Sequence, residues 1–150
     1  MTHAYTVSTP LPPGTKLERT TTTQDAEFED YDDDEKEYRT MIGSLMYLMF
    51  CTRPDMAFAV GALSRYNNTP KSSHMLAAKH LLRYVKKTSH ISLTLGPFVT
   101  KDLYPVLYCD GDWAGDVDTR NSPGGYVCVL TEDNPLREEP RRSAVSWSSK

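Results

Sequence analysis

Apolar side chains recur at helical spacing in three stretches between residues 38 and 87. The first stretch forms one face with spacings of four, three, one and three: Tyr38, Ile42, Leu45, Met46 and Met49. The second stretch carries Met56, Ala59, Val60 and Leu63 on one face, and the third carries Met75, Ala78, Leu82 and Val85. Three amphipathic helices with short connections predict a small helical bundle.

The connections contain helix stop and start signals. Thr52 can cap the second helix, Pro54 falls in its first turn, and Asp55 takes the third position. The third helix can start at residues 69–70 or at residues 72–73, where threonine or serine precedes the apolar pattern.

Beyond residue 90 the pattern changes to short apolar runs. Tyr104–Tyr108 and Tyr126–Leu130 are separated by a turn-rich segment, and Ala144–Ser149 alternates between apolar and polar residues. These runs predict three strands, and Ile91–Leu95 is a possible further short strand before Gly96. The fold class is therefore α+β, a three-helix bundle followed by three strands.

The first 37 residues differ in composition from the rest. Residues 1–24 are rich in proline and threonine, and residues 25–37 hold nine acidic residues against one lysine. Such like-charged chain predicts a solvated linker, with an acidic docking tail as the alternative. From residue 38 onward, 14 Lys and Arg against 10 Asp and Glu give a charge of +4. We expect a poorly ordered segment at 1–37, a helical region at 38–90, a connector at 91–102 and a strand region at 103–150.

The cysteines and the hydropathy indicate an intracellular protein, in the cytoplasm or the nucleus. Cys51, Cys109 and Cys128 are odd in number and fit neither a zinc pattern nor a disulfide framework, so no disulfide-linked partner is expected. No stretch approaches 18 consecutive apolar residues, so no membrane span or membrane partner is expected.

Two sets of residues are candidates for chemistry or binding. A basic stripe follows the third helix at spacings of four, three and one: Lys79, Arg83, Lys86 and Lys87. It can track a phosphate backbone, and the alternative is an ordinary solvated face. Asp110 ends the first strand, where a carboxylate can bind Mg²⁺ or serve as a turn residue. Loops starting at Asp110 or Asp116 lack an oxygen ligand at the fifth calcium position.

Several blocks of the chain resemble, in order, the Pol polyprotein of copia-type LTR retrotransposons. The resemblance is carried by Val7–Leu11, Tyr38–Leu48, Thr52–Val60, Ala77–Val85, Tyr108–Asp116, Ser122–Val127 and Val145–Lys150. It implies a segment running from the end of the reverse transcriptase into the ribonuclease H domain. The helices would form the thumb, which grips the template–primer duplex or an RNA/DNA hybrid. The strands would be the first three of the ribonuclease H sheet, an antiparallel three-stranded meander.

The same resemblance implies a role for Asp110 as the first of four carboxylates that hold two Mg²⁺ ions for RNA cleavage. The polymerase aspartates are expected before Met1, and the next ribonuclease H carboxylate after the third strand. The chain alone is therefore expected to be inactive and to hold Mg²⁺ only weakly. Two alternatives stay open: a nucleic-acid-binding accessory protein that uses the basic stripe, and a ribonuclease H subunit completed by another chain. Without covering helices, Val127 and Val129 are expected to be exposed.

Overall fold

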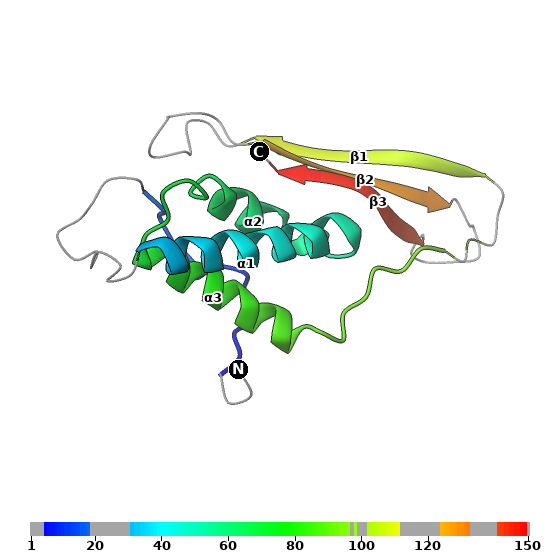
Figure 1. Cartoon of the computed structure of the whole chain (residues 1–150). Coiled ribbons are helices and arrows are strands. Elements are labelled where there is room, and N and C mark those ends of the chain that lie inside the picture. The colour runs from blue at the N-terminus through cyan, green and yellow to red at the C-terminus, as the bar shows by residue number, and fades with distance from the viewer. Residues whose placement is uncertain are drawn as a thin grey trace.

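Helices form the first half of the chain and a sheet forms the second (Figure 1). The computed structural model describes residues 5–18, 31–96, 98, 102–111, 124–132 and 141–149. The elements are α1 (Tyr31–Cys51), the 3-10 helix η1 (Pro54–Met56), α2 (Ala57–Ser64), α3 (Ser72–Lys87), β1 (Leu103–Gly111), β2 (Gly124–Glu132) and β3 (Arg142–Ser149). The predicted α+β class is confirmed.

Helix α1 buries the apolar face that the periodicity predicts. Tyr38, Ile42 and Leu45 are fully buried, and Met49 is 8% exposed. The helix begins at Tyr31, so residues 31–37 are helical where we expected poorly ordered chain. The helix dipole favours carboxylates in the first turns, which explains why this acidic stretch continues the helix. The acidic residues between 25 and 30 lie outside the described part of the chain.

Tyr38 ties α1 to the end of α2. Its hydroxyl donates a hydrogen bond of 2.8 Å to the carbonyl of Leu63, and its ring is fully buried. We expect Tyr38→Phe to lower the free energy of unfolding by about 1 kcal/mol, the usual net contribution of such a bond. Urea unfolding measures this, with Tyr47→Phe, which alters a 71% exposed ring, as the control.

The same substitution should also change how the free energy of unfolding depends on pH. Burial, together with nearby Tyr66, raises the pKa of Tyr38 well above its ordinary value, so the phenol ionises more easily in the unfolded chain. Its contribution to stability is therefore complete below about pH 10 and is lost as the pH rises further. The Phe variant should lack this alkaline loss, and an unchanged alkaline profile would contradict the assignment.

The connection from α1 to α2 differs from the predicted cap. Arg53, not Thr52, is the N-cap residue of η1, and no side chain caps this end. Pro54 occupies the first turn as predicted, and Asp55 follows it. The side chain of Arg53 instead donates hydrogen bonds to Asp55 and to Thr88. The predicted buried face of this region is confirmed by Met56, Ala59, Val60 and Leu63.

Helix α3 begins at Ser72, the later of the two predicted starts. Met75 and Ala78 are buried as predicted, but Leu82 and Val85 are only half-buried. The centre of the buried face is formed instead by Ala77, Leu81 and Tyr84, together with His74. His74 stacks on Tyr66 with ring centroids 3.9 Å apart and accepts the backbone N–H of Lys71.

The three predicted strands form an antiparallel sheet in the order β1-β2-β3. The further short strand at residues 91–95 is wrong, because this stretch has no regular structure in the described chain. Ile91 and Leu95 are 48% and 65% exposed, so burial of their side chains does little to hold this stretch in a strand. Gly96 then turns the chain at a φ of 64°.

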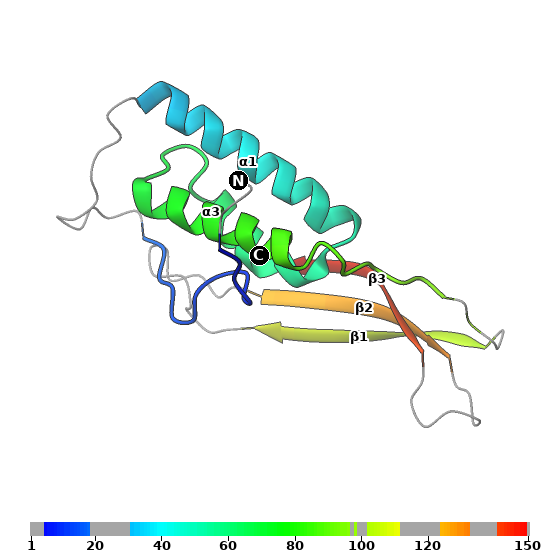
Figure 2. The same ribbon diagram turned by 90° about the horizontal axis from the view of Figure 1, so that it is seen from below.

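The helices lie on one side of the sheet at the end of β3, and β1 is the strand farthest from them (Figures 1 and 2). A Cβ atom on Gly61 of α2 would lie 3.2 Å from the carbonyl oxygen of Ser149, so the helix and β3 approach closely there. The indole N–H of Trp147 donates a bond of 2.9 Å to the carbonyl of Met49. Val129 is only 8% exposed and Val127 is half-buried, which corrects the exposure expected for both.

Residues 5–18 have no helix or strand, as predicted, but they pack on the helical core. Val7, Leu11 and Leu17 are partly buried against it. The hydroxyl of Tyr66 also donates a 2.7 Å bond to the carbonyl of Leu17. The spaced apolar side chains of this stretch therefore find partners on the helices.

Candidate functional site

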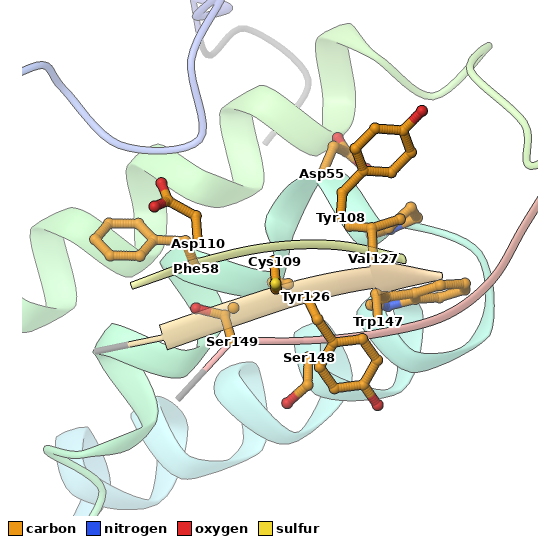
Figure 3. Close-up of a pocket in the computed structure, with 13 residues that line it drawn as sticks. Asp55, Phe58, Tyr108, Cys109, Asp110, Tyr126, Val127, Trp147, Ser148 and Ser149 are labelled. Atoms are coloured by element: carbon orange, nitrogen blue, oxygen red, sulfur yellow. The ribbon is translucent and has the colours of Figure 1, made fainter. Parts of the chain in front are cut away.

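Asp110 lies at the end of β1, in register with Gly125 of β2. It is exposed, and its Oδ1 accepts the N–H of Gly111 at 2.9 Å. It lines a cleft of about 350 Å³ between the sheet and the start of the second helical segment (Figure 3). The strand end predicted from the sequence therefore does present this carboxylate at a concave surface.

The opposite wall of the cleft comes from η1 and α2. Asp55 and Phe58 line it there, and Tyr108, Trp147 and Ser148 line it on the sheet. Asp55 is thus a second carboxylate in the same cleft. Sequence reasoning assigned it only to a helix start, because nothing in the local pattern brings residue 55 beside residue 110.

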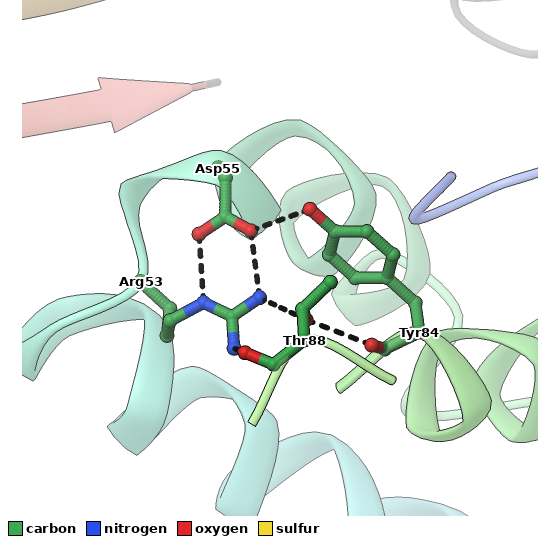
Figure 4. Close-up of polar contacts among 4 residues, drawn as sticks. All are labelled: Arg53, Asp55, Tyr84 and Thr88. Carbon is green, nitrogen blue, oxygen red and sulfur yellow. Dashed lines mark hydrogen bonds and ion pairs between the residues drawn. The ribbon is translucent and has the colours of Figure 1, made fainter. Parts of the chain in front are cut away.

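Asp55 is already engaged in a polar network that joins η1 to the end of α3 (Figure 4). The Arg53 guanidinium donates to both of its oxygens, at 2.9 Å and 2.8 Å, and the hydroxyl of Tyr84 donates to Oδ2 at 2.8 Å. Arg53 also donates to the hydroxyl of Thr88 at 2.6 Å and, at 3.3 Å, to its carbonyl. This network uses four of the five N–H groups of Arg53 and holds Asp55 in place.

The network determines the charge state of Asp55. Burial by itself raises the pKa of Asp55, but the hydrogen bonds from Arg53 and Tyr84 and the positive charge of Arg53 outweigh it. The pKa is therefore lowered overall, and the carboxylate is ionised at neutral pH. An ionised carboxylate that a bidentate arginine already holds is a poor candidate for a metal ligand.

Within the described residues, no group of three or more His, Cys, Asp or Glu side chains could hold a metal ion. Asp112, Asp116 and Asp118 of the predicted turn lie outside the described part of the chain. Among the helices that the structure describes, none has the length and apolar character that a membrane crossing requires.

The basic stripe forms a separate surface on α3. None of Lys79, Arg83, Lys86 and Lys87 lines the cleft beside Asp110. The 16 residues of α3 contain these four cations and no carboxylate. We call this surface the basic face of α3.

The N-terminal segment lies against the basic face, a placement that no local pattern predicts. Arg83 stacks on the ring of Tyr5 with its guanidinium carbon 4.5 Å from the centroid. Lys87 donates a 2.7 Å bond to the hydroxyl of Ser8, and Nε2 of His80 lies 3.0 Å from the carbonyl of Thr9. These pairs are more than 70 residues apart in the sequence.

Comparisons with known proteins identify relatives of this chain. Over its full length it is 37% identical to the Pol polyprotein from transposon RE1 of Arabidopsis thaliana, of which it spans 9%. It is 40% identical over 115 residues to that of transposon TNT 1-94 from Nicotiana tabacum, of which it spans 8%. Over 113 residues, 75% of this chain, it is 41% identical to secreted RxLR effector protein 161 of Plasmopara viticola and spans 71% of that protein.

No family model and no solved structure matches the chain. The predicted resemblance is confirmed by the Pol relatives, because one alignment spans all 150 residues and others keep about 40% identity over three quarters of the chain. The chain belongs to the copia-type retrotransposon Pol polyproteins, of which it corresponds to a short piece.

Proposed function

We propose that this piece of a Pol polyprotein binds a nucleic-acid duplex through the basic face of α3 and has no catalytic activity by itself. The observation that carries the proposal is the charge of α3, four cations and no carboxylate in 16 residues. Lysine and arginine that neutralise phosphates supply most of the sequence-independent affinity for nucleic acid. In this proposal the helices correspond to the reverse transcriptase thumb, and a template–primer duplex or an RNA/DNA hybrid is the ligand.

The contacts of the basic face support this use. Arg83 contacts Tyr5 and Lys87 contacts Ser8, and both partners are neutral. Their positive charges therefore stay available to a polyanion. In contrast, Arg39 and Arg53 each pair with a carboxylate within the fold.

We further propose that the sheet corresponds to the first three strands of a ribonuclease H domain, with Asp110 as its first metal-binding aspartate. Two Mg²⁺ ions require several carboxylates to offset their charge and fix their geometry. In the described part of the cleft, Asp55 is the other carboxylate, and Arg53 and Tyr84 hold it. These residues do not fit a two-metal centre, so we expect no cleavage by this chain.

The binding proposal is tested with an RNA/DNA hybrid at several salt concentrations. The variant combining Lys79→Gln, Arg83→Gln, Lys86→Gln and Lys87→Gln should bind at least about tenfold more weakly at low salt. The slope of log affinity against log salt should fall by about 0.9 for each phosphate that the variant no longer neutralises. Fluorescence anisotropy with a labelled hybrid measures both quantities.

A matched control neutralises exposed cations elsewhere: Lys16→Gln, Lys36→Gln and Arg142→Gln. It changes the net charge by three without touching α3, so it should alter the affinity much less than the α3 variant. Equal losses in the two variants would contradict a specific face. Mg²⁺-dependent cleavage of the hybrid that Asp110→Asn abolishes would overturn the inactive assignment and favour a site completed by another chain.

A further inference from the structure

Residues 5–9 form a strap beside the basic face of α3 and place an aromatic ring on it. The ring of Tyr5 lies on the Arg83 guanidinium at 4.5 Å, and Arg83 Nη1 donates a 3.0 Å hydrogen bond to its hydroxyl. Tyr5 is nevertheless 70% exposed. The ring is thus supported by a cation and still open to a ligand.

Residues that follow Tyr5 in the chain hold the strap in place. Nε2 of His80 lies 3.0 Å from the carbonyl of Thr9, which can only accept, so the imidazole donates. Val7 packs on the helical core between Tyr5 and Ser8. Tyr5 is therefore held in place before a ligand arrives, which lowers the entropy cost of binding.

The strap changes the chemistry of the basic face without changing its charge. Residues 5–9 are Tyr, Thr, Val, Ser and Thr, with no carboxylate. They add hydroxyl groups and one aromatic ring beside Arg83 and Lys87. An aromatic ring next to cations is the combination that binds single-stranded nucleic acids, because bases stack on the ring while phosphates contact the cations.

We propose that Tyr5 is a stacking site for an unpaired base of a single strand whose phosphates contact Arg83 and Lys87. The inference rests on the proposed binding of nucleic acid at α3 and extends it. The basic face then takes an unpaired strand as well as a duplex, and Tyr5 distinguishes the two, because the bases of a blunt duplex are already stacked on each other.

The test compares two single-stranded DNA probes of equal length, oligothymidine and an abasic chain with the same phosphates. Tyr5→Ala should weaken binding of oligothymidine about tenfold, the fold-change expected for one lost base–aromatic stack. Binding of the abasic chain and of a blunt duplex should stay within about twofold. Tyr5→Phe keeps the ring and should keep the oligothymidine affinity.

The α3 variant described above separates this inference from the proposed function. It should weaken binding of all three probes, and if it weakens none, the proposed function fails. If it weakens them while Tyr5→Ala leaves oligothymidine unaffected, only the stacking site is overturned. An equal loss by Tyr5→Ala on oligothymidine and on the abasic chain would overturn it too, because Tyr5 would then only support Arg83. Tighter binding by Tyr5→Ala would show that the strap shields the face, which also overturns the inference.

Discussion

Replacing Asp55 by alanine is expected to lower the free energy of unfolding by about 3 kcal/mol. Arg53 is only 5% exposed, and without Asp55 its guanidinium is a buried charge with no counterion. Breaking a buried ion pair from one side costs about 3–5 kcal/mol. The lower end applies here because the side chain of Asp55 is 34% exposed and water can reach the site. Chemical denaturation at neutral pH measures the difference.

The exposed ion pair of α1 provides a matched control. Glu35 and Arg39 pair one helical turn apart, and the side chain of Arg39 is 51% exposed. Glu35→Ala should cost about 0.5 kcal/mol or less, because exposed pairs are screened and water replaces the lost partner. Similar losses for Asp55→Ala and Glu35→Ala would contradict the structural role of the Arg53 network.

The pH dependence of the free energy of unfolding tests the role of Asp55 independently. Although burial opposes it, the hydrogen bonds from Arg53 and Tyr84 lower the pKa of Asp55 in the folded chain below its ordinary 3.8. The unfolded chain therefore takes up this proton first as the pH falls. The contribution of Asp55 is complete above about pH 4 and is lost as the pH falls through the lower folded value. The gap between the wild-type chain and Asp55→Ala should be constant from neutral to weakly acidic pH and should shrink below about pH 4.

The helix patterns show how far local sequence predicts this fold. In α1 the charged neighbours of Tyr38 leave a single apolar choice there, and the period also selects Ile42 and Leu45 correctly. In α3 the pairs Leu81–Leu82 and Tyr84–Val85 are both apolar. The period cannot choose between neighbours, and packing against the other helices selects the first of each pair.

Some features of the candidate sites also follow from local sequence, and others do not. The end of β1 at Asp110 follows from an apolar run and a turn, and the basic face follows from helical spacing. The hydrogen bonding that holds Asp55 includes Tyr84, 29 residues away in the sequence. The strap is held by contacts between residues up to 79 apart. Contacts of this kind leave no local pattern in the sequence.

Trp147→Ala is expected to lower the free energy of unfolding by about 3 kcal/mol and to loosen the sheet from the helices. Trp147 is half-buried against the helical core, so the loss lies at the lower end of the roughly 3–5 kcal/mol typical of deleting a large aromatic side chain. Its indole N–H also satisfies the carbonyl of Met49, one of the last four carbonyls of α1, which have no partner within the helix. Trp147→Phe keeps most of the ring, loses this bond, and should cost about 1 kcal/mol.

Hydrogen exchange distinguishes loosening from general destabilisation. Because Trp147 of β3 contacts the end of α1, its loss should lower the protection of β2 and β3 amides more than that of α1 and α3. Val145→Ala, on the same strand at a 45% exposed position, is the control and should change neither measurement appreciably. Equal loss of protection in helices and strands would mean that the two parts unfold as one unit. The cleft beside Asp110 would then be as stable as the helical core rather than dependent on the contact of Trp147 with α1.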